Sequence, residues 1–112
     1  MSVSLTLHKI YCVVTSEPGN DELFFTSQID GGDQIRFPAG DGNYHSISAG
    51  GSWVVDQHFT FNSSLVITLW DEDNWPSTSD YLGQETYTPE NLPLEATVSG
   101  TGAQYQLYIV KR

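Results

Sequence analysis

The sequence predicts an all-β protein, an antiparallel β-sandwich of about eight strands. Apolar and polar residues alternate with the two-residue period of a strand, as in Leu65, Ile67 and Leu69. Ten glycines and five prolines divide the 112 residues into short runs separated by turns. No long window repeats its apolar residues with the period of a helix. Two facing sheets would bury the alternating apolar sets between them.

The extended runs follow one another between turn clusters. The first spans Val3 to Val14, and its apolar parity changes near His8 and Lys9, which predicts a β-bulge there. The segment Asp30–Asp33 reads D-G-G-D between two runs and predicts a hairpin. Since no repeat or linker interrupts the pattern, residues 1–112 are expected to form a single domain. The predicted runs cover residues 3–14, 22–29, 34–37, 44–47, 53–55, 58–61, 65–70, 81–88, 94–100 and 103–112.

The charge balance of the chain excludes several functions. Fourteen acidic residues face only four lysines and arginines, which gives a formal net charge of −10. Such a chain lacks the basic surface that nucleic acid requires, and an anionic membrane repels it unless a cation intervenes. The first residues show no signal peptide, and no apolar run reaches the roughly 18 residues of a membrane helix. We therefore expect a soluble, cytoplasmic protein, with signal-free export left open.

An acidic loop follows the predicted run that ends at Trp70. Its sequence, D-E-D-N-W-P-S-T-S-D, holds Asp71, Asp73 and Asp80 within ten residues. These like charges repel, and calcium, which takes about 6–8 oxygen ligands, would turn the repulsion into coordination. Glu72 points the other way if the segment is still extended, so it is not counted as a ligand. A loop that is merely solvated is the alternative interpretation.

A second acidic loop follows the first predicted run. Glu17 and Asp21 lie in it, within the stretch T-S-E-P-G-N-D-E-L-F-F. If the two strands that precede the acidic loops end at the same edge of the sandwich, the loops meet there. Five carboxylates would then surround one small volume, which strengthens the hypothesis of a cation site.

Three stretches of the sequence together resemble a known family, the C2 domain. P-G-N-D-E-L-F-F-T-S-Q looks like the exit of the family's first loop. V-V-D-Q-H-F-T-F-N-S-S-L-V-I-T-L-W-D-E-D is similar to the family's F-x-F, polar turn and apolar strand ending in D-x-D, and D-Y-L-G-Q matches the close of its third loop. The stretches occur in the family's order between Leu5 and Gln84. The family's lysine-rich lipid-binding strand is absent, and Glu17 stands where the family has Asp.

The resemblance implies an eight-stranded, C2-like β-sandwich that binds calcium and docks onto a phospholipid membrane or another surface. Calcium would be held by the two loops, and its open coordination positions would meet lipid phosphates. Trp75 and Pro76, at the tip of the third loop, would contact that surface. The calcium ligands that the resemblance implies are Glu17, Asp21, Asp71, Asp73 and Asp80.

An alternative function stays open beside this one. The domain could recognise a glycan or a protein, as a lectin-like or structural module, with calcium only stiffening its loops. Exposed aromatic rings stack on sugars, but Trp53 and Trp70 lie on predicted strands and are expected to pack. The three histidines and Cys12 lack zinc-binding spacing, and no serine has the context of a catalytic nucleophile, so we expect no enzyme.

Overall fold

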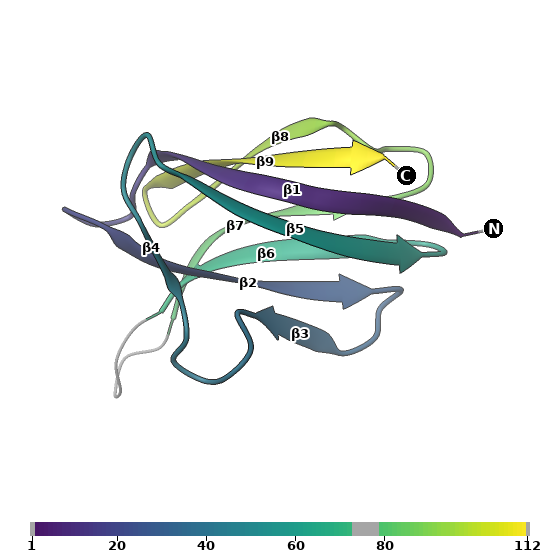
Figure 1. The fold of residues 1–112 in the computed structure, drawn as a ribbon, viewed down its shortest axis with the longest axis horizontal. Coiled ribbons are helices and arrows are strands. Elements are labelled where there is room, and N and C mark those ends of the chain that lie inside the picture. Colours follow the sequence, from purple (N-terminus) through teal and green to yellow (C-terminus); the bar gives the residue numbers. More distant parts are fainter. Residues whose placement is uncertain (1, 73–78, 112) are drawn as a thin grey trace.

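The computed structural model describes residues 2–72 and 79–111, which form two antiparallel sheets packed face to face (Figure 1). Within the described residues no helix has the length and apolar character that crossing a bilayer requires. The strands are β1 (Val3–Val14), β2 (Asp21–Ile29), β3 (Gln34–Phe37), β4 (His45–Ile47), β5 (Ser52–Phe61), β6 (Leu65–Asp71), β7 (Asp80–Tyr87), β8 (Glu95–Gly100) and β9 (Ala103–Lys111).

The two sheets differ in their number of strands. One sheet has four strands in the order β5-β1-β9-β8. The other has five, with β3-β2-β6-β7 in a row and the short β4 also paired with β2. All pairings are antiparallel, so the prediction of an antiparallel β-sandwich is confirmed.

The strand boundaries confirm some local predictions and change others. The register of β1 shifts between Leu7 and Lys9 against both of its neighbours, which confirms the predicted bulge. The predicted hairpin joins β2 to β3. The sequence predicted two runs, 53–55 and 58–61, where the structure has one strand, β5. Asp56 adopts a φ of 44° opposite the β1 bulge, and this irregularity lets β5 continue through a polar stretch.

The core lies between the inward faces of the two sheets. Alternate residues of each long strand point into it, for example Leu65, Ile67 and Leu69 of β6, all with 0% exposure. Burying one such side chain stabilises the fold by about 1.5–3 kcal/mol. The largest fully buried side chains are Tyr87, Tyr105, Phe25, Phe61, Leu5, Leu7, Ile10, Leu23, Leu65, Ile67, Leu69 and Leu82.

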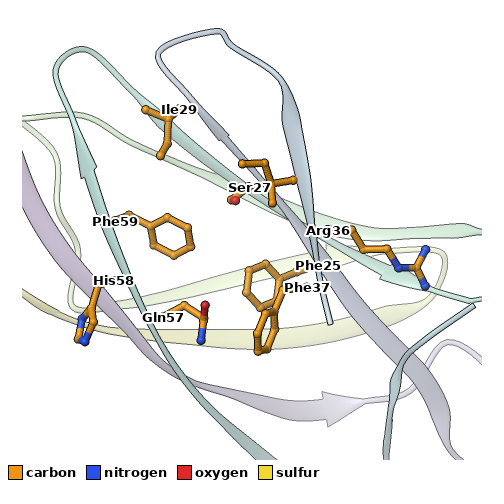
Figure 2. A pocket seen from close by; sticks show the side chains of 9 residues that line it. Phe25, Ser27, Ile29, Arg36, Phe37, Gln57, His58 and Phe59 are labelled. Carbon is orange, nitrogen blue, oxygen red and sulfur yellow. The ribbon is translucent and has the colours of Figure 1, made fainter. Parts of the chain in front are cut away.

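The two long sides of the sandwich are built differently. On one side β7 and β8, from opposite sheets, approach closely at Gly83, where an added Cβ would lie 2.7 Å from the Ser99 nitrogen and 2.9 Å from the Val98 Cβ. On the other side β3 and β5 stand apart around a cavity of about 240 Å³ (Figure 2). The rings of Phe25, Phe37 and Phe59 line this cavity. Gly83 therefore lets the two sheets approach closely at β7 and β8, whereas a cavity lies between them at β3 and β5.

A carboxylate also secures the turn between β5 and β6. Asp30, just after β2, accepts hydrogen bonds from the backbone nitrogens of Asn62, Ser63 and Ser64 at 2.6–3.1 Å. These bonds lower the pKa of Asp30 to about 2, because they favour the charged carboxylate. Some of the acidic residues of this chain thus serve the fold itself.

We expect the replacement Gly83→Ala to destabilise the protein by at least about 2 kcal/mol, because the new methyl group clashes with β8 and the φ of +125° is unfavourable for alanine. Gly102→Ala is the matched control, since Gly102 also has a positive φ, +80°, but no atom lies within 4 Å of an added Cβ. Chemical denaturation of both variants measures the difference. Equal losses of stability would show that the close approach of β7 and β8 contributes nothing.

Candidate functional site

The first acidic loop and the end of β6, where the second acidic loop begins, meet at one end of the sandwich. The β1–β2 loop and the end of β6 lie at the same end of the molecule, on the left in Figure 1. Ser16 in the β1–β2 loop places its Oγ 2.8 Å from Asp21 Oδ1 and 3.3 Å from Asp71 Oδ2. The expectation that the strands before these loops end at the same edge is therefore confirmed.

Three carboxylates come together at this end. Oxygens of Glu17, Glu22 and Asp71 all lie within 4.8 Å of one another, and we call these three residues the acidic cluster. Glu17 is exposed, Glu22 is half-buried and Asp71 is buried, so the cluster extends from the surface into the interior. Asp80, the first residue of β7, is the direct cross-strand partner of Asp71. Side chains directly opposite in a ladder share a face, but the group of oxygens within 4.8 Å of one another does not include Asp80.

Asp71 owes its burial to its position on β6. It continues the inward-facing positions of Leu69 and Ile67 and has 0% exposure. Its Oδ1 accepts a hydrogen bond of 2.7 Å from the backbone nitrogen of Glu22. On the outer side of the cluster, the hydrogen bond and negative charge of Glu22 raise the pKa of Tyr44. The cluster therefore contacts a backbone amide through Asp71 and a tyrosine hydroxyl at the surface through Glu22.

Asp21 is buried at the same end, and its carboxylate accepts hydrogen bonds from groups within the fold. It begins β2 on the inward face, with 0% exposure. Oδ1 accepts from the Ser16 hydroxyl at 2.8 Å, and Oδ2 accepts from the Tyr105 hydroxyl at 2.6 Å. The Ser16 nitrogen lies 3.1 and 2.9 Å from the two oxygens. Burial and the hydrogen bond to Asp21 raise the pKa of Tyr105, so the phenol stays protonated and donates.

Glu72 points away from the cluster and is neutralised. Its Oε1 lies 2.6 Å from Arg36 Nη2, and both side chains are mostly buried. The same Arg36 nitrogen donates to the Asn43 carbonyl at 2.6 Å, and the guanidinium lies 3.5 Å above the centre of the Phe24 ring. This contact fixes the backbone immediately after β6 to β3 and to the loop that follows it.

The residues expected as ligands therefore fall into three groups. Glu17 and Asp71 belong to the acidic cluster, and Asp80 stands opposite Asp71. Asp21 lies at the same end but is held by Ser16 and Tyr105. Asp73, and the expected contact residues Trp75 and Pro76, lie outside the described residues.

Glu22 is the member of the cluster that sequence reasoning missed. It was counted as an ordinary strand residue, because it opens the run E-L-F-F-T-S-Q-I. The available signal was its place beside Asp21, directly after the first acidic loop. The pairing of Leu23 with Asp71 sets Glu22 beside the end of β6, and that register cannot be read from either strand alone.

Trp53 and Trp70 pack within the fold, and the cavity has a different lining from the cluster. Trp53 stacks on His45, with ring centroids 4.8 Å apart, and Trp70 donates from Nε1 to Thr26 Oγ1 at 3.1 Å. The cavity in Figure 2 is lined by Phe25, Ser27 and Ile29 of β2 and by parts of β3 and β5. Its described lining includes no Asp or Glu. The paired carboxylates that a glycosidase needs therefore do not line this cavity.

Comparison with solved structures identifies the fold. A C2 domain of plant Extended Synaptotagmin 1 aligns over 99% of this chain and 93% of its own, with a TM-score of 0.55 and 8% identity. Human GIVD cytosolic phospholipase A2, in complex with a linolenyl fluorophosphonate inhibitor and terbium chloride, aligns over 99% of this chain with a TM-score of 0.56 and 11% identity. The chain spans only 17% of that phospholipase.

Comparisons at the level of sequence add nothing to this likeness. The sequence matches no protein-family model and no curated protein. The assignment therefore comes from the two sheets and from their near-complete alignment with a C2 domain, despite the low identity. This chain has the fold of a C2 domain.

Proposed function

We propose that this C2-like domain binds calcium through its acidic cluster and, with the ion bound, docks onto a phospholipid surface. The observation that carries the proposal is the convergence of Glu17, Glu22 and Asp71, whose oxygens lie within 4.8 Å of one another. Glu17 and Glu22 are near one another in the sequence, but Asp71 is 49 residues beyond Glu22 and is brought to them by the fold. The fold is one in which such loops bind calcium and lipid.

The chemistry of the cluster suits a hard divalent cation. Calcium takes about 6–8 oxygen ligands in irregular arrangements, whereas magnesium demands a nearly ideal octahedron. The cluster supplies carboxylates at three levels of exposure, and Asp80 adds one from the neighbouring strand. We include Asp73 as a further proposed ligand on the grounds of its D-x-D spacing. Backbone carbonyls and water would complete the coordination.

Calcium would also change how the domain meets a membrane. The net charge of −10 opposes approach to anionic lipid, and a bound divalent cation makes the local field less negative where the two loops meet. Lipid phosphates would then occupy the coordination positions that the protein leaves open. Trp75 and Pro76 are proposed as apolar contacts with the interface, which tryptophan favours. The likeness to a phospholipase studied with an acyl-chain inhibitor and terbium, a hard cation, supports this direction.

Calcium should raise the melting temperature of the protein. A ligand that binds only the folded state stabilises it by about 2.7 kcal/mol at a hundredfold excess over Kd. We expect a rise of several degrees in millimolar calcium and a smaller rise in magnesium, measured by circular dichroism with an EDTA reference. Melting curves that coincide in all three buffers would contradict calcium binding.

The variants Glu17→Gln and Glu22→Gln should each lower calcium affinity about tenfold, because affinity follows the number of charged ligands. In the absence of calcium their stability should stay within about 0.5 kcal/mol of the parent or increase, since repulsion in the cluster falls. Isothermal titration calorimetry and urea denaturation measure the two effects. Glu90→Gln is the matched control, because it removes one exposed charge from the β7–β8 loop, at the opposite end of β7 from Asp80. If all three variants bind calcium equally, the cluster is not the site.

The protein should sediment with phosphatidylserine-containing vesicles in calcium and stay in the supernatant with EDTA. Trp75→Ala should weaken sedimentation while calcium affinity is retained, because the indole contributes apolar burial rather than ligand oxygens. Leu94→Ala, which trims an exposed apolar side chain where β8 begins, is the control and should change neither property. Calcium binding without vesicle binding would reject the lipid surface and favour a glycan or protein partner.

A further inference from the structure

One hydrogen-bonded chain connects the core to the acidic cluster. It begins at Tyr105, an inward-facing residue of β9 with 0% exposure. Its hydroxyl crosses to the opposite sheet and donates to Asp21 Oδ2 at 2.6 Å. Tyr105 and Asp21 are 84 residues apart in sequence, so this single bond joins the two sheets at the acidic end.

Asp21 in turn holds Ser16 of the β1–β2 loop in place. Ser16 is held by its backbone nitrogen and its hydroxyl, which both lie within 3.1 Å of the Asp21 carboxylate. Four close contacts then surround the two oxygens of Asp21, about as many as a carboxylate can accept. Because Ser16 and Tyr105 already engage both oxygens of Asp21, its role lies within the fold.

Asp71 is oriented by a backbone amide next to Asp21. The Glu22 nitrogen, one residue from Asp21, donates to Asp71 Oδ1 at 2.7 Å. The Ser16 hydroxyl, already bound to Asp21, lies 3.3 Å from Asp71 Oδ2. The single hydroxyl proton of Ser16 goes to Asp21 at the shorter distance, so the donor to Asp71 is the Glu22 amide, which follows Asp21 directly in the chain. Groups that orient a metal ligand in this way commonly contribute 10- to 100-fold to metal affinity, on the order of what the ligands themselves contribute.

We propose that Tyr105 is a positioning residue of the cation site, and that Asp21 is its buried anchor rather than a cation ligand. Through Asp21 and the adjoining backbone amide of Glu22, the Tyr105 hydroxyl fixes the direction of the Asp71 carboxylate. The inference rests on the proposed calcium function for its effect on affinity. The anchoring itself exists with or without an ion.

The chain offers a matched pair of tyrosines for the test. Tyr87 is as deeply buried as Tyr105, at 0% exposure, but its hydroxyl has no hydrogen-bond partner within the described residues. Tyr105→Phe and Tyr87→Phe remove the same atom from the same core. We expect Tyr105→Phe to weaken calcium binding about tenfold in calorimetry, and Tyr87→Phe to leave it unchanged. A Tyr105→Phe variant with the parent's affinity would overturn the positioning role.

Amide hydrogen exchange in the calcium-free protein separates this inference from the proposed function. The amides of Ser16 and Glu22 should exchange faster in Tyr105→Phe than in Tyr87→Phe, because the anchor has loosened. If the parent binds no calcium and this difference is still seen, the proposed function fails and the anchor stands. If calcium binds and exchange at both amides is unchanged, the anchor fails alone.

The effect of Asp21→Asn on stability distinguishes an anchor from a ligand. An anchor that loses its charge also loses the strength of its hydrogen bonds, so the calcium-free melting temperature should fall. If Asp21 were mainly a cation ligand, its neutralisation would reduce repulsion in the cluster, and the calcium-free melting temperature would stay the same or rise, as expected for Glu22→Gln. A rise in the melting temperature of Asp21→Asn without calcium would overturn the assignment of Asp21 as an anchor.

Discussion

Two buried carboxylates at one end of an apolar interior impose the main constraint on this structure. Asp21 and Asp71 both have 0% exposure, although each continues a row of leucine, isoleucine or phenylalanine side chains. Burying an unpaired charge costs several kcal/mol, so donors must be brought to these oxygens. The donors come from the β1–β2 loop, from the start of β2 and, through Tyr105, from the opposite sheet. Satisfying the charges therefore aligns both sheets at this end.

The other acidic residues at this end, Glu17, Glu22 and Glu72, lie nearer the surface and have different partners. Arg36 binds Glu72 and so takes one carboxylate out of the local field. Glu17 and Glu22 stay close to Asp71. A divalent cation is the simplest group that can hold three such oxygens within 4.8 Å of one another. The proposed cation site is therefore formed by the acids that converge, while the neighbouring acids are anchored or neutralised.

The alternation of apolar residues was enough to predict the sandwich and the bulge near His8, whereas the meeting of the two acidic loops was expected only on the condition that the strands before them end at the same edge. The first two features follow from local periods and from the parity of single strands. The role of Asp21 could not be predicted in the same way, since its partner Tyr105 is 84 residues away in sequence. Glu22 joined the cluster through the register of β2 against β6. The predicted run 44–47 is present as the short β4, and the runs 53–55 and 58–61 join in β5, so nine strands are described where about eight were expected.

A second bulge explains how two like charges come to face each other. Along most of the β6–β7 ladder Leu65 pairs with Tyr87 and Leu69 with Gly83, a register that would set Asp71 opposite Tyr81. The register shifts after Leu69, so Asp71 faces Asp80 instead. Gly83, with its φ of +125°, lies at the shift and also allows β8 to approach. Opposed like charges destabilise a sheet. A backbone irregularity that creates this pairing, rather than avoiding it, is consistent with a ligand that binds there.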